Sequence, residues 1–175
     1  MVEVFDITIQ EAMPDKPKCE VRIMEMGVGT GLLGLELKKK GYTNLDALHV
    51  SHKMLDEAKK KGVYTKLICS NLTEKRTPGI EDGEYNALIL SGVVALVYIK
   101  PLAFHEMMRV VSNGGIICFD VLTKDIPDFR PAMIELEKQG LWTLIKEEQV
   151  PHYSIEDSAL PKSTPVFAFK VNHKE

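Results

Sequence analysis

Short apolar runs alternate with amphipathic stretches along most of the chain. The apolar runs, each of a length typical of a strand, span 21–26, 45–50, 64–69, 85–90 and 116–122. Helical patterns are expected at about 32–40, 51–61, 102–111 and 131–139. The run at 85–90 is nearly all apolar, which is typical of a strand buried on both faces of a parallel sheet. The alternation predicts a doubly wound α/β fold.

The alternation of strand and helix patterns ends near the C-terminus. Two further apolar runs, 142–150 and 166–171, have no helix between them. Parallel neighbours need a crossover and antiparallel neighbours do not, so we expect a closing antiparallel hairpin with a long loop at 152–165. This gives a mostly parallel seven-stranded sheet. Before residue 21, the segment 5–13 fits either a strand or a helix.

Length and composition narrow the class of protein. The 175 residues are 45% apolar, which suits a single domain over 1–175 with a short N-terminal extension at 1–20. The net charge of -3 gives no basic surface for nucleic acid. No apolar run reaches the roughly 18 residues of a membrane span, and no secretory signal is evident. Because Cys69 and Cys118 fall in predicted strands, we expect reduced core thiols and a cytoplasmic location.

A glycine-rich turn follows the first predicted strand. Glycines there let the backbone approach a ligand, and the next helix points free N–H groups at it. Gly29, Gly31 and Gly34 satisfy the dinucleotide pattern G-x-G-x-x-G. In the alternative interpretation, Gly27, Gly29 and Gly31 form the loop, and Glu25 stands two residues earlier. The pattern therefore favours a cofactor site and leaves two cofactors open.

The second interpretation resembles the class I S-adenosylmethionine-dependent methyltransferases, whose first motif is an acidic residue, one residue, and G-x-G-x-G. The resemblance extends over about 21–122. It includes Met54 after the second strand, Tyr85-Asn86-Ala87 at the fourth and Asn113-Gly114-Gly115 before the fifth. The closing hairpin is also similar to that family. The general residue pattern of 60–72 resembles the Williams–Beuren-region methyltransferase-like subgroup.

This resemblance implies S-adenosylmethionine as cofactor and a role for each matching residue. Glu25 would accept a hydrogen bond from its ammonium group, directly or through water, and the three loop glycines would pass beside its methionine and ribose parts. Met54 would pack on the adenine face, although ordinary helix core is an equal alternative. Leu72 would offer its backbone N–H to the adenine edge. Ser91 would lie near the methionine part and the transferred methyl.

Two positions depart from the family pattern. His49 stands where an acid normally accepts both ribose hydroxyls, and Asn71 stands where an acid normally binds the adenine amino group. Asp46 is three residues from His49, roughly 10 Å along a strand and on the other face. Since hydrogen bonds to charged groups contribute about 1.5–3 kcal/mol and neutral ones about 0.5–1.5, the departures together cost about 2–3 kcal/mol. That is on the order of 30–150-fold in affinity.

Three functional hypotheses follow. The first is a methyltransferase with an unidentified acceptor, the second a catalytically silent methyltransferase-like scaffold, and the third a nicotinamide-dependent oxidoreductase. We assign no catalytic residue, although Tyr98, His105, His152 and Tyr153 could lie near the pocket mouth. His49 and His52 lack a third ligand, so no metal is predicted. The short N-terminus suggests a large acceptor, a partner protein that completes the pocket, or an incomplete chain.

Overall fold

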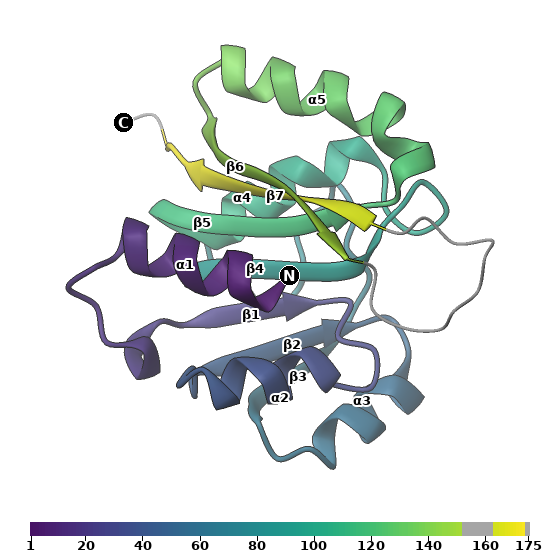
Figure 1. The fold of residues 1–175 in the computed structure, drawn as a ribbon. Helices are drawn as coiled ribbons and strands as arrows, with labels where there is room; N and C mark the ends of the chain where they lie inside the picture. Colours follow the sequence, from purple (N-terminus) through teal and green to yellow (C-terminus); the bar gives the residue numbers. More distant parts are fainter. Residues whose placement is uncertain (152–162, 174–175) are drawn as a thin grey trace.

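The fold is a seven-stranded sheet between two layers of helices (Figure 1). It comes from a computed structural model that describes residues 1–151 and 163–173. The strands are β1 (Ile23–Met26), β2 (Leu45–His49), β3 (Tyr64–Cys69), β4 (Tyr85–Val94), β5 (Val111–Val121), β6 (Trp142–Pro151) and β7 (Ser163–Val171). The helices are α1 (Val2–Ala12), α2 (Leu32–Lys39), α3 (His52–Lys59), α4 (Phe104–Val110) and α5 (Ile126–Lys138), with 3₁₀ turns at Lys18–Glu20, Pro101–Ala103 and Thr123–Asp125.

The strand order is β3-β2-β1-β4-β5-β7-β6. β1 pairs in parallel with both β2 and β4, so the order reverses beside β1. β7 runs antiparallel to β5 and to β6. The predicted doubly wound sheet with a closing hairpin is therefore confirmed. In such sheets, ligands bind beyond the carboxyl ends of the strands where the order reverses.

Alternate residues of β1 face different helical layers. Ile23 packs in the cluster built on α1 and α2, whereas Met24 and Met26 pack in the cluster built on α4 and α5. Figure 1 shows α1 lying across one face of the sheet and α4 behind the other. Because both faces are covered, the central strands are buried nearly throughout, as their apolar runs predict.

One open alternative is resolved, and two predicted boundaries are wrong. Residues 5–13, which fit either a strand or a helix, belong mainly to helix α1, which buries Phe5 and Ile9 at the period of a helix. Asn113-Gly114-Gly115 does not precede the fifth strand but lies inside β5, where the pairing register with β4 shifts. Helix α5 begins at Ile126, so Pro131 lies inside the helix and does not start it. Pro127 occupies the first turn, where a missing N–H costs no hydrogen bond.

The cysteine prediction was half wrong. Cys118 is buried, but Cys69 is exposed because β3 pairs only with β2 and forms an edge of the sheet. Of the predicted loop at 152–165, residues 163–165 belong to β7 and 152–162 lie outside the described residues. Across the described ranges, no helix combines the length and apolar character that crossing a membrane requires.

Candidate functional site

A cavity of about 480 Å³ opens at the carboxyl ends of β1 to β4, beside the reversal of strand order. This volume lies within the range typical of small-molecule sites, roughly 300–1,000 Å³. The cavity is lined by Met26, Gly27, Gly29, Leu48, His49, Val50, Met54, Ser70, Asn71, Leu72, Ser91, Gly92, Val93, Tyr98 and Ile99. It brings together Gly27, Gly29, His49, Met54, Asn71, Leu72 and Ser91 of the predicted cofactor residues. Glu25 and Gly31 are not among the lining residues.

The first two loop glycines have different surroundings. Both have positive φ, +76° for Gly27 and +55° for Gly29, so an L side chain would strain the turn at either position. A Cβ on Gly27 would lie 2.5 Å from Cγ1 of Val93, because the ends of β1 and β4 approach closely there. Among the residues that the structure describes, a Cβ on Gly29 would meet nothing within 4 Å. Gly29 thus presents bare main chain to the open cavity.

The other two glycines of the motif accommodate a tyrosine ring. Tyr64 begins β3, and its side chain lies under the first turn of α2. A Cβ on Gly31 would come within 3.1 Å of Tyr64 Cε2, and a Cβ on Gly34 would clash with the Tyr64 hydroxyl. These two glycines therefore have a packing role that requires no ligand.

Glu25 lies behind the loop and is only 3% exposed. Its Oε2 accepts a hydrogen bond from the Tyr64 hydroxyl at 2.8 Å. Within the described residues, Oε1 has no hydrogen-bond partner. Burial raises the pKa of Glu25 to about 7, and the Tyr64 hydrogen bond partly opposes this rise. The carboxyl is thus poised between its neutral and charged forms near neutral pH.

His49 offers a donor where the family pattern has an acid. Its Nδ1 accepts a hydrogen bond from the backbone N–H of Ser51 at 2.9 Å, so the ring proton is on Nε2. Burial lowers the pKa of His49, which favours this neutral form. Asp46 does not substitute for the acid: it is buried and binds Arg22 at 3.1 Å and the Tyr85 hydroxyl at 3.0 Å.

The end of β4 forms another part of the cavity wall. The β4–β5 register is irregular between Leu90 and Val94, and Asp120 of β5 accepts a hydrogen bond from the backbone N–H of Gly92 at 2.7 Å. This contact fixes the bulged segment that presents Ser91 to the cavity. Val93 was missed by the sequence interpretation, which had only the apolar run after the fourth strand as a signal.

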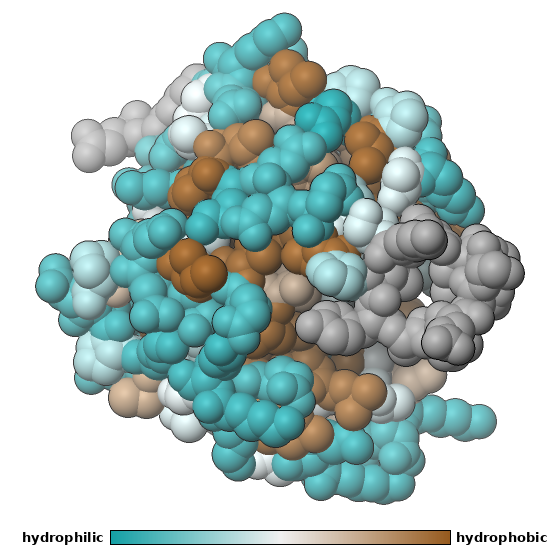
Figure 2. Space-filling model, viewed as in Figure 1, coloured by the Kyte–Doolittle hydropathy of each residue, from teal (hydrophilic) through white to brown (hydrophobic). Residues whose placement is uncertain are grey.

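Two residues left open by the sequence now have definite surroundings. Met54 is 41% exposed and lines the cavity, so it does not belong to the core under α3. Tyr98 is 65% exposed and also lines the cavity, in agreement with its predicted place near the pocket mouth. His152 and Tyr153 lie outside the described residues. On the face shown in Figure 2, hydrophobic residues gather in small patches among hydrophilic ones.

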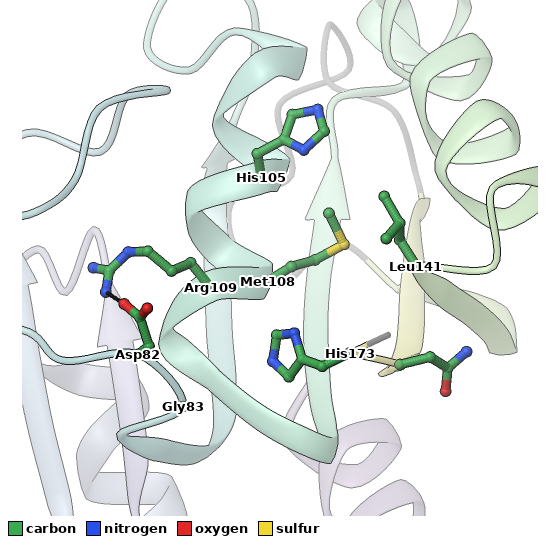
Figure 3. Close-up of a pocket in the computed structure, with 8 residues that line it drawn as sticks. Asp82, Gly83, His105, Met108, Arg109, Leu141 and His173 are labelled. Atoms are coloured by element: carbon green, nitrogen blue, oxygen red, sulfur yellow. Dashed lines mark hydrogen bonds and ion pairs between the residues drawn. The ribbon is translucent and has the colours of Figure 1, made fainter. Parts of the chain in front are cut away.

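His105 lies elsewhere, in a second cavity of about 510 Å³ at the amino ends of the parallel strands. Figure 3 shows His105 and Met108 projecting from one side of α4, Arg109 extending from the other side toward Asp82, and His173 lying near Met108. The Arg109 guanidinium is held by Glu106 at 2.7 Å and by Asp82 at 2.6 Å. Its charge is thus already compensated, and we take the carboxyl-edge cavity as the functional site because it joins the glycine loop to the strand ends.

Comparison with known proteins gives matches of sequence and of fold. The family described as "Methyltransferase domain" matches residues 24–119. Human methyltransferase-like protein 27 is 26% identical over 139 residues, which cover 77% of this chain and 56% of that protein. The chain therefore spans little more than half the length of this curated relative.

Two solved structures share the fold. The plantazolicin methyltransferase BpumL in complex with SAH superposes with a TM-score of 0.74 at 13% identity, covering 98% of this chain and 82% of that one. Magnesium protoporphyrin IX methyltransferase from Synechocystis PCC 6803, with bound SAM, gives 0.67 at 13% identity, covering 98% and 79%. At such identities the likeness extends to the fold alone.

Proposed function

The chain belongs to the methyltransferase-domain family, and from this premise we propose that it is an S-adenosylmethionine-dependent methyltransferase that uses the carboxyl-edge cavity. The observation that carries the proposal is the open space in front of Gly29, bordered by Met54 of α3, Leu72 after β3 and Ser91 of β4. The two superposed methyltransferases named with SAM or SAH support the choice of cofactor.

The residues present fit this cofactor. Main chain at Gly29 gives a surface that a flat nucleoside or an extended methionine moiety can approach closely. Met54 provides an apolar, polarisable face for adenine. Leu72 follows β3 and lines the cavity, and its backbone N–H would bind the edge of the base. Because the Ser51 N–H binds Nδ1, His49 would donate one hydrogen bond from Nε2 to a ribose hydroxyl. Bound S-adenosylmethionine supplies the activated methyl, and the chain positions the acceptor against it.

The charge of the cavity sets the expected affinity. Among the described residues, no Asp, Glu, Lys or Arg lines it, and Glu25 stands behind the loop. A cofactor with two cationic groups and one carboxylate therefore meets mainly dipoles and apolar surface. We expect binding in the micromolar to millimolar range, about 4–8 kcal/mol. Failure to bind at all would leave two hypotheses, the catalytically silent scaffold and the nicotinamide-dependent oxidoreductase, neither of which a comparison specifically supports.

Calorimetric titration with S-adenosylhomocysteine tests the proposal. We expect heat and a thermal shift in wild type, and a strong loss of both in Gly29→Leu, whose side chain would occupy the cavity. Gly79→Leu is a matched control, because Gly79 has φ +75° and nothing within 4 Å of an added Cβ but does not line the cavity. No binding to wild type at millimolar ligand, or equal binding to both variants, would refute the assignment.

The finer statements are part of the same proposal. The methyl acceptor, whether small molecule or protein, is unassigned, and a partner protein that completes the pocket is part of the proposal. We propose a cytoplasmic location, with no nucleic-acid or membrane partner. Membership of the Williams–Beuren-region subgroup stays a prediction. Tritium transfer from labelled S-adenosylmethionine to candidate acceptors, with Gly29→Leu as the blank, measures the activity directly.

A further inference from the structure

The ring of Tyr64 is built into the base of the glycine loop. It extends from the start of β3 beneath α2 and touches the positions of Gly31 and Gly34, and Ala58 of α3 borders the same space. Gly31 has φ +84° and caps the N-terminus of α2, so the ring packs directly under the residue that ends the loop. Any displacement of this ring must move either the loop or the helix.

The hydroxyl of Tyr64 gives this ring a second contact. It donates to Oε2 of Glu25 at 2.8 Å and leaves Oε1 without a partner among the described residues. Glu25 is nearly fully buried, but Oε1 is not among the fully buried atoms that lack a partner, so this oxygen keeps some access to solvent. A carboxylate with one oxygen fixed and the other free is suited to receive a cation that reaches it past the loop.

We propose that Tyr64 is a positioning residue of the cofactor site: its ring supports the glycine loop, and its hydroxyl holds Glu25 so that Oε1 is free for the cofactor's ammonium group. This inference rests on the proposed function. Tyr64 does not itself line the cavity, so it acts through Glu25 and the loop. The sequence gives no signal for this role, because Tyr64 and Glu25 are 39 residues apart.

The charge state of Glu25 links this geometry to pH. Within the described residues, Tyr64 is the titratable side chain whose hydrogen bond changes the pKa of Glu25. Burial favours the neutral acid, whereas the Tyr64 hydroxyl and a bound ammonium both favour the carboxylate. Removing the hydroxyl should therefore leave Glu25 neutral over a wider pH range. Cofactor binding that depends on the carboxylate should then require a higher pH.

The test is Tyr64→Phe, which keeps the ring and removes only the hydroxyl. We expect S-adenosylhomocysteine affinity to fall roughly tenfold at pH 7, the equivalent of one hydrogen bond, and the difference from wild type to narrow as the pH rises to 8, where the variant's Glu25 ionises further. Tyr42→Phe is the matched control. Its hydroxyl is also buried and also donates to a carboxylate at 2.8 Å, that of Asp6, but Tyr42 does not line the cavity. Tyr42→Phe should leave affinity and pH dependence unchanged.

Two further measurements separate the possible failures. In a Glu25→Gln background, Tyr64→Phe should cause no additional loss of affinity. If Tyr64→Phe does not fold, carbon-13 NMR of glutamate side chains in wild type serves instead, and the Glu25 signal should titrate near neutral pH and shift toward the carboxylate when S-adenosylhomocysteine is added. Binding to wild type with identical pH profiles for both tyrosine variants, or a Glu25 signal indifferent to ligand, overturns this inference alone. No binding to wild type refutes the proposed function.

Discussion

Replacing Glu25 by glutamine is expected to change stability in a way that depends on pH. In the folded protein, burial raises the pKa of Glu25 from 4.5 to about 7. A group whose folded pKa is raised contributes its full stability below the unfolded pKa and loses it as pH rises toward the folded pKa. At roughly 1.4 kcal/mol per pH unit, the rise from 4.5 to about 7 corresponds to a loss of about 3 kcal/mol. Glutamine has no such titration.

Urea unfolding of wild type and Glu25→Gln at a series of pH values measures this difference. Relative to wild type, the variant should gain stability steadily between pH 4.5 and 7, by about 3 kcal/mol in all, and the difference should then stay level up to pH 8. The amide oxygen of the introduced glutamine can still accept the Tyr64 hydrogen bond, so the buried contact is retained. A stability difference that is constant across this range would show that folding does not raise the pKa of Glu25, and would refute the reasoning. The same variant should bind S-adenosylhomocysteine more weakly at pH 8, since a neutral amide cannot pair with an ammonium.

Two other substitutions test the site and its support. His49→Asp should strengthen S-adenosylhomocysteine binding about tenfold in calorimetry, because a carboxylate accepts from both ribose hydroxyls whereas His49 donates one hydrogen bond; unchanged affinity would show that the ribose does not lie there. Gly34→Ala should lower the free energy of unfolding by about 2 kcal/mol, since the clash with Tyr64 outweighs the helix preference of alanine. In a Tyr64→Leu background the same change should become neutral or stabilising, and a persistent cost there would contradict the packing argument.

From residue 21 onward, local periodicity was sufficient to predict the order of strands and helices, but it left residues 5–13 open. The nearly apolar run at 85–90 predicted a strand buried on both faces, and β4 has that environment. Errors arose where one residue type serves two purposes. Pro131 was interpreted as a helix start, yet Pro127 occupies the first turn of α5. Asn113-Gly114-Gly115 was interpreted as a break before a strand, but a β-bulge uses the same residues.

The site shows the same division between local and long-range information. Strand ends converge at one edge by topology, so His49, Asn71 and Ser91 could be assigned to one cavity from their places after strands. Partners within the site could not be assigned in this way. The sequence shows that His49 replaces an acid, but only the structure shows that Ser51 occupies Nδ1 and leaves Nε2 as a donor.

The glycine motif shows why a pattern match does not assign a role to each of its residues. Gly29 is open to the cavity, Gly27 makes room for Val93, and Gly31 and Gly34 make room for Tyr64. A side chain is excluded at all four positions, but only at Gly29 does the exclusion leave space for a ligand. Substitution at the packing glycines would therefore reduce cofactor binding by displacing Tyr64, and hence Glu25, even if no ligand atom came near them. Loss of binding in such variants alone cannot identify a contact residue. The cofactor contact is better tested at Gly29, where an added Cβ meets no atom of the described residues and the side chain extends from open space, once the backbone strain has been matched at Gly79.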